Sequence, residues 1–133
     1  MVPYEDPLAS VKEIEKWAGN EHFIQVLLLS RTAEPLGQRK YWPIYDAACK
    51  AGLPVAVHAF GYGGAPVTGG GWPSFYIEEM VGHAQNTQSL VTSMVIEGVF
   101  EKFPTLKLIL VEAGFAWLPA LSWRLDKLWD RMR

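Results

Sequence analysis

The sequence predicts an α/β fold built from parallel β/α units. Three short runs of almost wholly apolar residues are separated by segments with the amphipathic spacing of helices. Runs that are apolar throughout are typical of strands buried on both faces of a sheet, and strands separated by helices pair in parallel through right-handed crossovers. We therefore expect three adjacent parallel strands, in chain order, over residues 23–30, 54–58 and 106–111.

Helices are expected before, between and after these strands. The first begins near Asp6 or Ser10, either of which suits a helix N-cap, and it carries apolar side chains at spacings of three and four. The second has a proline in its first turn and ends at Gly52. The expected helices cover residues 8–18, 41–51, 75–84, 87–102 and 121–132.

Length and composition limit the class of protein. The 133 residues suffice for a single domain with one core, which we place over residues 1–133. Half of the residues are apolar, which excludes bulk disorder, and the net charge of −2 with scattered basic residues makes neither a nucleic acid nor a membrane surface an expected partner. Because the single cysteine, Cys49, cannot form an internal disulfide and no signal-peptide pattern opens the chain, we expect a cytoplasmic location.

Polar side chains stand where each expected strand ends. Arg31 follows the first strand, His58 ends the second, and Glu112 follows the third. The carboxyl ends of parallel strands form the active-site face in open α/β sheets and in (β/α) barrels alike. We therefore expect a site at this edge, with His58 and Glu112 directed to it from neighbouring strands and with Arg31 as a substrate-binding cation.

Each of these residues also has a purely structural interpretation. A neutral imidazole at a strand end can bind zinc or exchange a proton, and the alternative for His58 is a buried ring hydrogen-bonded to a backbone carbonyl. A carboxylate there can serve as a general base, a metal ligand or a substrate anchor, and the alternative for Glu112 is an ion pair with Arg31 or with another cation on this face. His83, within an expected helix, is interpreted as a surface or hydrogen-bonded histidine.

A glycine-rich loop follows the second expected strand. Between residues 59 and 73, glycine occupies positions 61, 63, 64, 69, 70 and 71. No Gly-Lys-Ser/Thr sequence follows, and no Gly-x-Gly-x-x-Gly opens a helix, so a nucleotide is not an expected ligand. We expect a mobile lid whose Tyr62 and Trp72 contact the substrate, with a simple flexible connection as the alternative.

Five stretches spread over nearly the whole chain carry a family resemblance. The most specific part is the strand-end His58, followed before the next strand by Glu-Gly-Val-Phe-Glu-Lys-Phe-Pro over residues 97–104. The five stretches cover residues 35–45, 52–59, 71–78, 97–104 and 112–119. Together they resemble the amidohydrolase-related family of metal-dependent TIM-barrel hydrolases and decarboxylases. A complete (β/α)8 barrel needs about 250 residues, so the resemblance implies a partial barrel of about three of the eight units.

The resemblance implies a divalent-metal site, with zinc as the expected metal. Family members hold the metal with a His-x-His pair on the first strand, a histidine on the fifth and an aspartate on the eighth, and His58 corresponds to the fifth-strand ligand. Glu112 stands at the end of the sixth strand, where many members carry a catalytic histidine, and this departure counts against their decarboxylase mechanism. Because the chain has no His-x-His pair, the resemblance places it in units four to six, with an incomplete metal site.

The function expected from these observations is metal-dependent hydrolysis of an amide or ester bond in a small-molecule substrate, incomplete within this chain. Decarboxylation of an unsaturated or aromatic acid is one alternative. A catalytically inert fragment that associates with itself is another. Because three parallel strands leave two sheet edges unpaired, we expect a homo-oligomer that forms through those edges.

Overall fold

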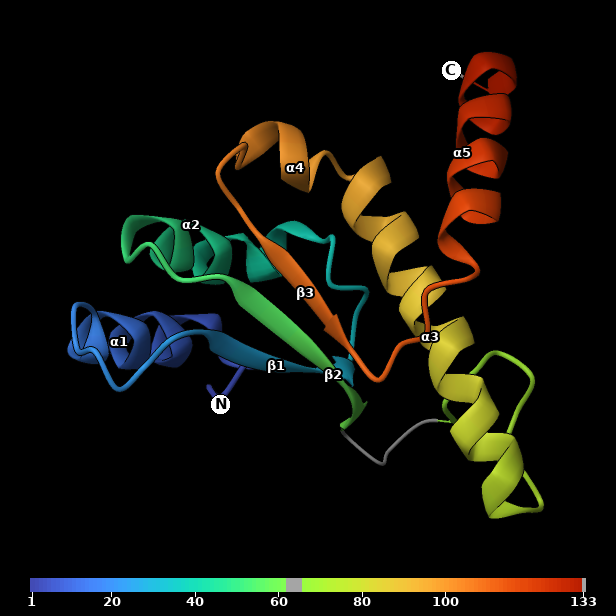
Figure 1. Ribbon diagram of the computed structural model, residues 1–133, viewed down its shortest axis with the longest axis horizontal. Coiled ribbons are helices and arrows are strands. Elements are labelled where there is room, and N and C mark those ends of the chain that lie inside the picture. Colours follow the sequence, from blue (N-terminus) through green and yellow to red (C-terminus); the bar gives the residue numbers. More distant parts are fainter. Residues whose placement is uncertain (62–65, 133) are drawn as a thin grey trace.

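The computed structural model describes residues 1–61 and 66–132 and has the expected α/β architecture. Figure 1 shows α1 and α2 side by side along the sheet, α3 crossing near the carboxyl ends of the strands, and α5 standing apart from them. The elements in chain order are α1 (Pro7–Trp17), β1 (Val26–Arg31), the 3-10 helix η1 (Arg39–Tyr41), α2 (Trp42–Lys50), β2 (Val55–Gly61), α3 (Tyr76–Ile96), α4 (Val99–Lys102), β3 (Leu108–Val111) and α5 (Leu118–Met132).

The three strands form one parallel sheet in the order β1-β2-β3. The register places Leu29 of β1 opposite His58 of β2, and His58 opposite Val111 of β3. The prediction of three adjacent parallel strands in chain order is therefore confirmed. It also follows that the last residues of the three strands lie along one edge, where Figure 1 shows the strands converging.

The strand boundaries differ from the expected ones. β1 begins only at Val26, because Phe23 turns back onto the ring of Trp17, with 4.7 Å between the ring centroids, and Ile24 is 75% exposed. β2 continues past His58 to Gly61, into what was expected to be loop. β3 begins two residues later than expected, at Leu108.

The helices between β2 and β3 divide at a different place from the expected one. α3 runs unbroken through residues 85 and 86, where we expected a break between two helices. The side-chain amide of Asn86 donates hydrogen bonds to the carbonyl and hydroxyl oxygens of Ser30 and so does not compete for its own helix backbone. The break comes instead at Gly98, whose φ of 77° is the left-handed conformation that ends helices.

One face of the sheet packs against the helices and forms the core. Its strand residues are buried together with side chains from α1, α2, α3 and α4. The largest contributions to this core come from Leu28, Tyr41, Ile44, Tyr45, Val55 and Met94, all fully buried. This face is the interior of the protein.

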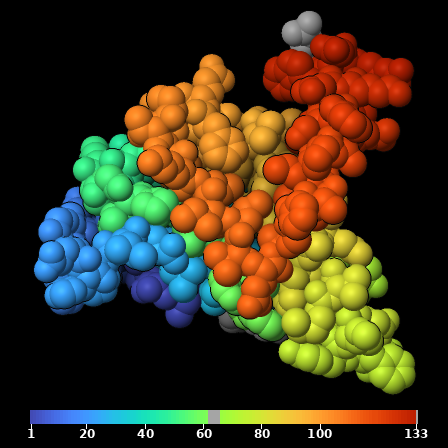
Figure 2. Space-filling view, in the orientation of Figure 1, coloured from blue at the N-terminus to red at the C-terminus, as the bar shows by residue number. Residues whose placement is uncertain are grey.

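The opposite face of the sheet is only partly covered. Leu27 and Leu29 of β1 are half-buried and lie outside the core cluster, and Ile109 of β3 is 40% exposed. The expectation that every strand is buried on both faces is therefore wrong for β3. α5 is also loosely packed, since none of its residues is buried, and Figure 2 shows it projecting from the rest of the molecule.

Candidate functional site

His58 stands near the end of β2, on the open face of the sheet. Its Nδ1 lies 2.8 Å from the carbonyl oxygen of Ala59. A carbonyl can only accept a hydrogen bond, so Nδ1 carries the ring proton, and in the neutral imidazole Nε2 is left with its lone pair free. The backbone hydrogen bond proposed as a structural role for His58 is thus present, and it prepares Nε2 to bind a cation or accept a proton.

Glu112 comes directly after β3 and meets His58 across the strand ends. Its Oε1 lies 3.7 Å from Nε2 of His58, and the glutamate side chain is 59% exposed. The expectation that both side chains reach the carboxyl edge from neighbouring strands is confirmed by this contact. A carboxylate facing an imidazole nitrogen can share a proton or a cation with it.

Arg31 does not pair with Glu112. Its Nη1 lies 2.9 Å from Oε1 of Glu79 on α3, and its side chain is only 11% exposed. α3 brings its own carboxylate to the guanidinium, and no ion pair between Arg31 and Glu112 occurs among the contacts of the described residues. An ion pair of Glu112 with another cation on this face stays a prediction. A role for Arg31 in substrate binding stays a prediction.

The aromatic residues expected on the lid contribute no described contact to the site. Trp72 is 66% exposed, and within residues 1–61 and 66–132 no ring contact or hydrogen bond joins it to His58 or Glu112. Tyr62 lies outside the described residues. The lid, with both of its contact residues, stays a prediction.

His83 occupies a different environment from the expected one. It is 2% exposed, and neither ring nitrogen has a hydrogen-bond partner among the described residues, so its interpretation as a surface or hydrogen-bonded histidine is wrong. Because α3 is continuous, His83 falls on the buried stripe that continues through Thr87, Leu90 and Met94. The same spacing is present in the sequence, but the expected break at residues 85 and 86 concealed it.

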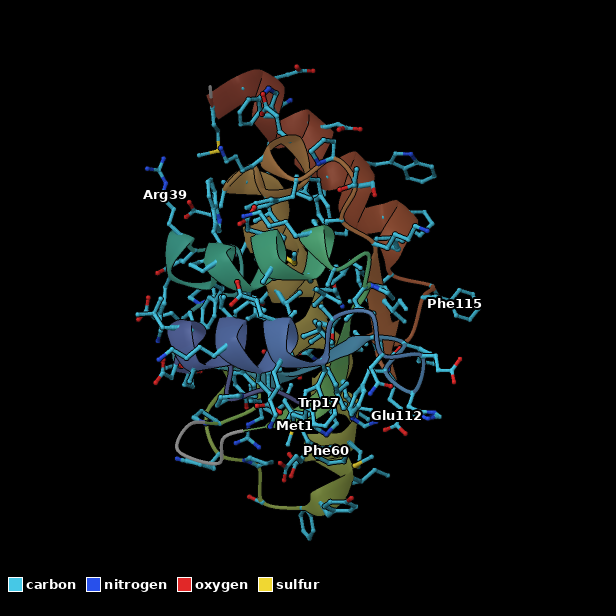
Figure 3. The ribbon with its side chains drawn as sticks, turned by 90° about the vertical axis from the view of Figure 1, so that its left-hand side faces the viewer. Met1, Trp17, Arg39, Phe60, Glu112 and Phe115 are labelled. Atoms are coloured by element: carbon cyan, nitrogen blue, oxygen red, sulfur yellow. The ribbon has the colours of Figure 1, made fainter. Side chains whose placement is uncertain are left out.

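Phe60 is a residue of the site that the sequence did not indicate. Its ring stacks on that of His58, with 6.0 Å between the centroids and an interplanar angle of 18°. Phe60 and Glu112 are the two non-glycine residues with positive φ in the described part of the chain, at 77° and 58°. In Figure 3 both lie in the lower half of the view, well below Arg39. Such conformations cluster at functional sites, where surrounding structure holds them in place.

A cleft of about 930 Å³ lies on the other side of β1, between residues 31–36 and α3. Its wall is rich in neutral polar side chains and includes Arg31, Asn86 and Ser93. Neither His58 nor Glu112 lines it. This cleft and the edge of the sheet that carries His58 and Glu112 are therefore separate places.

The described residues fit part of a metal site. No group of three or more histidine, cysteine, aspartate or glutamate side chains placed to hold a metal ion occurs within residues 1–61 and 66–132. His58 and Glu112 offer at most two donors, whereas a catalytic zinc site uses three protein ligands. The free Nε2 of His58 is the donor best prepared for this purpose.

No helix in the described part of the chain has the length and apolar character needed to cross a lipid bilayer.

The fold of this chain is similar to parts of three larger solved structures. An amidohydrolase from Mycobacterium avium subsp. paratuberculosis K-10 superposes with a TM-score of 0.79 at 23% identity, covering 98% of this chain and 35% of its own. A candidate amidohydrolase from Staphylococcus aureus gives 0.70 at 22% identity, covering 95% and 44%. The 5-carboxyvanillate decarboxylase LigW from Sphingomonas paucimobilis gives 0.66 at 23% identity, covering 95% and 37%.

These likenesses establish the fold and the extent of the match. The chain spans less than half the length of each of the three structures, and its three parallel β/α units form part of a TIM barrel. The family model described as amidohydrolase matches residues 1–132, almost the whole sequence. The chain therefore belongs to the amidohydrolase family.

Proposed function

We propose that this chain supplies part of the catalytic edge of a metal-dependent hydrolase that acts on an amide or ester bond of a small-molecule substrate. The observation that carries the proposal is the pair formed by His58 and Glu112. Nε2 of His58 faces Oε1 of Glu112 across 3.7 Å, at the carboxyl ends of adjacent parallel strands, while Nδ1 lies 2.8 Å from the Ala59 carbonyl oxygen. This is the edge at which barrel enzymes place their chemistry.

The two residues have different roles in this proposal. His58 donates the Nε2 lone pair as a metal ligand, with its Nδ1 proton held by the Ala59 carbonyl. The metal that His58 would help to hold, zinc by preference, would supply polarisation of the scissile carbonyl and a lower pKa for its bound water. Glu112, whose side chain is largely exposed, accepts the proton of the attacking water and returns it to the leaving nitrogen or oxygen as the C–N or C–O bond breaks.

The proposal treats residues 1–133 as one structural unit that holds an incomplete site. The family generally uses divalent metals, but the described residues provide fewer ligands than a catalytic centre needs. We therefore expect hydrolysis only where further ligands complete the site. We also retain Arg31, Tyr62 and Trp72 as the proposed substrate contacts and the cytoplasm as the proposed compartment.

A second candidate is decarboxylation of an unsaturated or aromatic acid. It is favoured by the structural likeness to a 5-carboxyvanillate decarboxylase, which covers 95% of this chain. Glu112 distinguishes the candidates, because a carboxylate suits activation of water better than approach to a carboxylate substrate. Release of carbon dioxide without uptake of water would favour the decarboxylase.

A third candidate is an inert chain that associates with itself. The half-open face of the sheet and the edges of β1 and β3 support it, since unpaired strand edges invite pairing with another chain. Val2 partly protects one edge, because its N–H donates to the carbonyl of Leu27 at 3.3 Å. We propose a homo-oligomer whose contacts use the remaining edge groups.

Equilibrium dialysis of zinc against the chain tests the role of His58. We expect His58→Ala to lose zinc that the wild-type chain binds, because the substitution removes the free Nε2. His22→Ala is the matched control, since His22 is an exposed histidine before β1 and should leave zinc binding unchanged. Equal zinc binding by wild type and His58→Ala, or none by wild type, would remove His58 from the ligands.

A further inference from the structure

The end of β2 contains a β-bulge next to His58. The register passes from Leu29 opposite His58 to Arg31 opposite Gly61, so Ala59 and Phe60 together stand opposite Ser30. Ser30 Oγ donates to the carbonyl of Phe60 at 3.3 Å, which ties the bulge to β1. Bulges of this kind occur beside active sites, where they redirect a side chain.

The backbone of the bulge is held in a conformation that its sequence disfavours. Phe60 has φ 77°, in the left-handed region that bulky residues rarely adopt. The next residue, Gly61, lies directly against β1, since a Cβ built there would be 2.6 Å from the carbonyl oxygen of Arg31. The hydrogen bond from Ser30 and the close approach at Gly61 fix the Phe60 carbonyl and the residue that follows it.

This backbone bears directly on the imidazole of His58. The peptide between Ala59 and Phe60 takes its orientation partly from φ of Phe60, and its carbonyl oxygen is the acceptor for Nδ1 of His58 at 2.8 Å. The bulge leaves Ala59 without a partner in the register, in contrast to His58 itself. A left-handed Phe60 therefore turns the Ala59 carbonyl toward the ring that precedes it.

The side chain of Phe60 holds the same imidazole from a second direction. Its ring stacks on His58 and meets the ring of His83 edge-on, with 4.6 Å between the centroids and an interplanar angle of 66°. His83 is 2% exposed within α3. The phenyl ring is therefore supported from behind by a buried helix residue while its face lies against His58.

We propose that Phe60 is a positioning residue for His58. Its left-handed backbone presents the Ala59 carbonyl to Nδ1, and its ring fixes the imidazole plane, so that the proton stays on Nδ1 and the Nε2 lone pair faces Glu112. The inference rests on the proposed role of His58 as a metal ligand, but it concerns how the ring is held. That arrangement is measurable in the metal-free chain.

Nitrogen-15 NMR of protein labelled at histidine tests the proposal. Magic-angle-spinning spectra at a pH where the rings are neutral report which nitrogen carries the proton, whatever the oligomeric state, and His58→Ala assigns the His58 signals. We expect wild-type His58 to hold its proton on Nδ1. In Phe60→Leu we expect a mixture in which the Nε2–H form, favoured by free histidine, becomes the larger part.

Matched variants separate positioning from general loss of packing. Phe100→Leu makes the same substitution at a residue of α4 with the same 36% exposure and should leave the His58 proton on Nδ1. Phe60→Tyr keeps the ring and should behave as wild type. Phe60→Asn suits the left-handed backbone but lacks the ring, so it gives the measurement if the leucine variant fails to fold, and a mixture of tautomers is again expected.

Two results would overturn the proposal: a wild-type His58 protonated on Nε2, or Phe60→Leu and Phe60→Asn variants that keep the proton wholly on Nδ1. Zinc dialysis gives a second measurement, since removing a residue that orients a metal ligand weakens metal affinity by about 10- to 100-fold. Unchanged zinc affinity in both variants would also count against it. If wild type binds no zinc, the proposed function fails while the tautomer result still decides the role of Phe60.

Discussion

The two faces of the sheet differ in what covers them and in what they carry. On the helix-covered face Leu28 is completely buried, whereas on the open face Ile109 of β3 is 40% exposed. His58 and its stacking partner Phe60 belong to the open side, and the two left-handed non-glycine residues of the described chain, Phe60 and Glu112, lie at its carboxyl edge. The packing that stabilises the fold thus lies on one side of the sheet. The backbone strain that arranges the site lies on the other.

We expect the largest effect on the free energy of unfolding from substitutions at two adjacent residues of β1 that face opposite sides of the sheet. Leu28→Ala should lower the free energy of unfolding by about 2–5 kcal/mol, because it leaves a cavity in a closed core. Leu29→Ala should cost less than about 2 kcal/mol, because Leu29 is only half-buried and water can fill the space. Urea denaturation followed by circular dichroism measures both. Equal losses would show that the open face is covered as completely as the core, and the comparison between the faces would fail.

We expect contacts between copies in the oligomer to cover the open face of the sheet. Ile109→Lys places a charge on the open face at edge strand β3 and should shift any oligomer toward monomer in sedimentation equilibrium at micromolar concentration. Val95→Lys is the control, because Val95 is 44% exposed on α3, away from the sheet face. If the two variants have the same oligomeric state as wild type, the open face is not the contact between copies.

The sequence allowed the topology and the location of the site to be predicted. Apolar runs separated by helices specify parallel pairing through the handedness of crossovers, and polar residues at strand ends mark the carboxyl edge. His58 and Glu112 follow from those two rules alone. Their 3.7 Å contact needs the register between β2 and β3, which continues evenly from Val55 to His58.

The remaining features of the site depend on contacts between distant residues. Nothing local to Phe60 indicates a left-handed backbone, because glycine at 61 is the residue that such a turn would normally use. The burial of His83 depends on α3 continuing past Asn86, whose amide is engaged by Ser30, 56 residues away in sequence. Periodicity does not indicate the backbone of Phe60, and it indicates the burial of His83 only once α3 is known to be continuous.

We expect the smallest effect on stability from a substitution in the N-terminal segment, which contributes to the helix-covered side of the sheet. Glu5 accepts hydrogen bonds from the Ala33 N–H at 2.8 Å and from Lys40 Nζ at 2.9 Å, and so ties residues before α1 to the loop after β1 and to η1. Burial raises the pKa of Glu5, but these hydrogen bonds and the charge of Lys40 outweigh it, and the net pKa lies below the ordinary value of 4.5. The ionised form is therefore favoured by folding.

A lowered pKa in the folded state gives a defined pH dependence. The contribution of Glu5 to stability is present above the ordinary pKa of 4.5 and is lost as the pH falls through the lower folded value. Because the pair is partly exposed, solvent screening limits the effect to less than about 1 kcal/mol.

Glu5→Gln should remove this part of the acid dependence measured by urea denaturation between pH 6 and pH 3, roughly the range over which folded carboxylates titrate. Glu21→Gln, at an exposed position before β1, should retain the wild-type curve. A Glu5→Gln curve parallel to wild type would show that the hydrogen bonds of Glu5 do not stabilise the helix-covered side, and that burial in the core alone maintains the difference between the two faces.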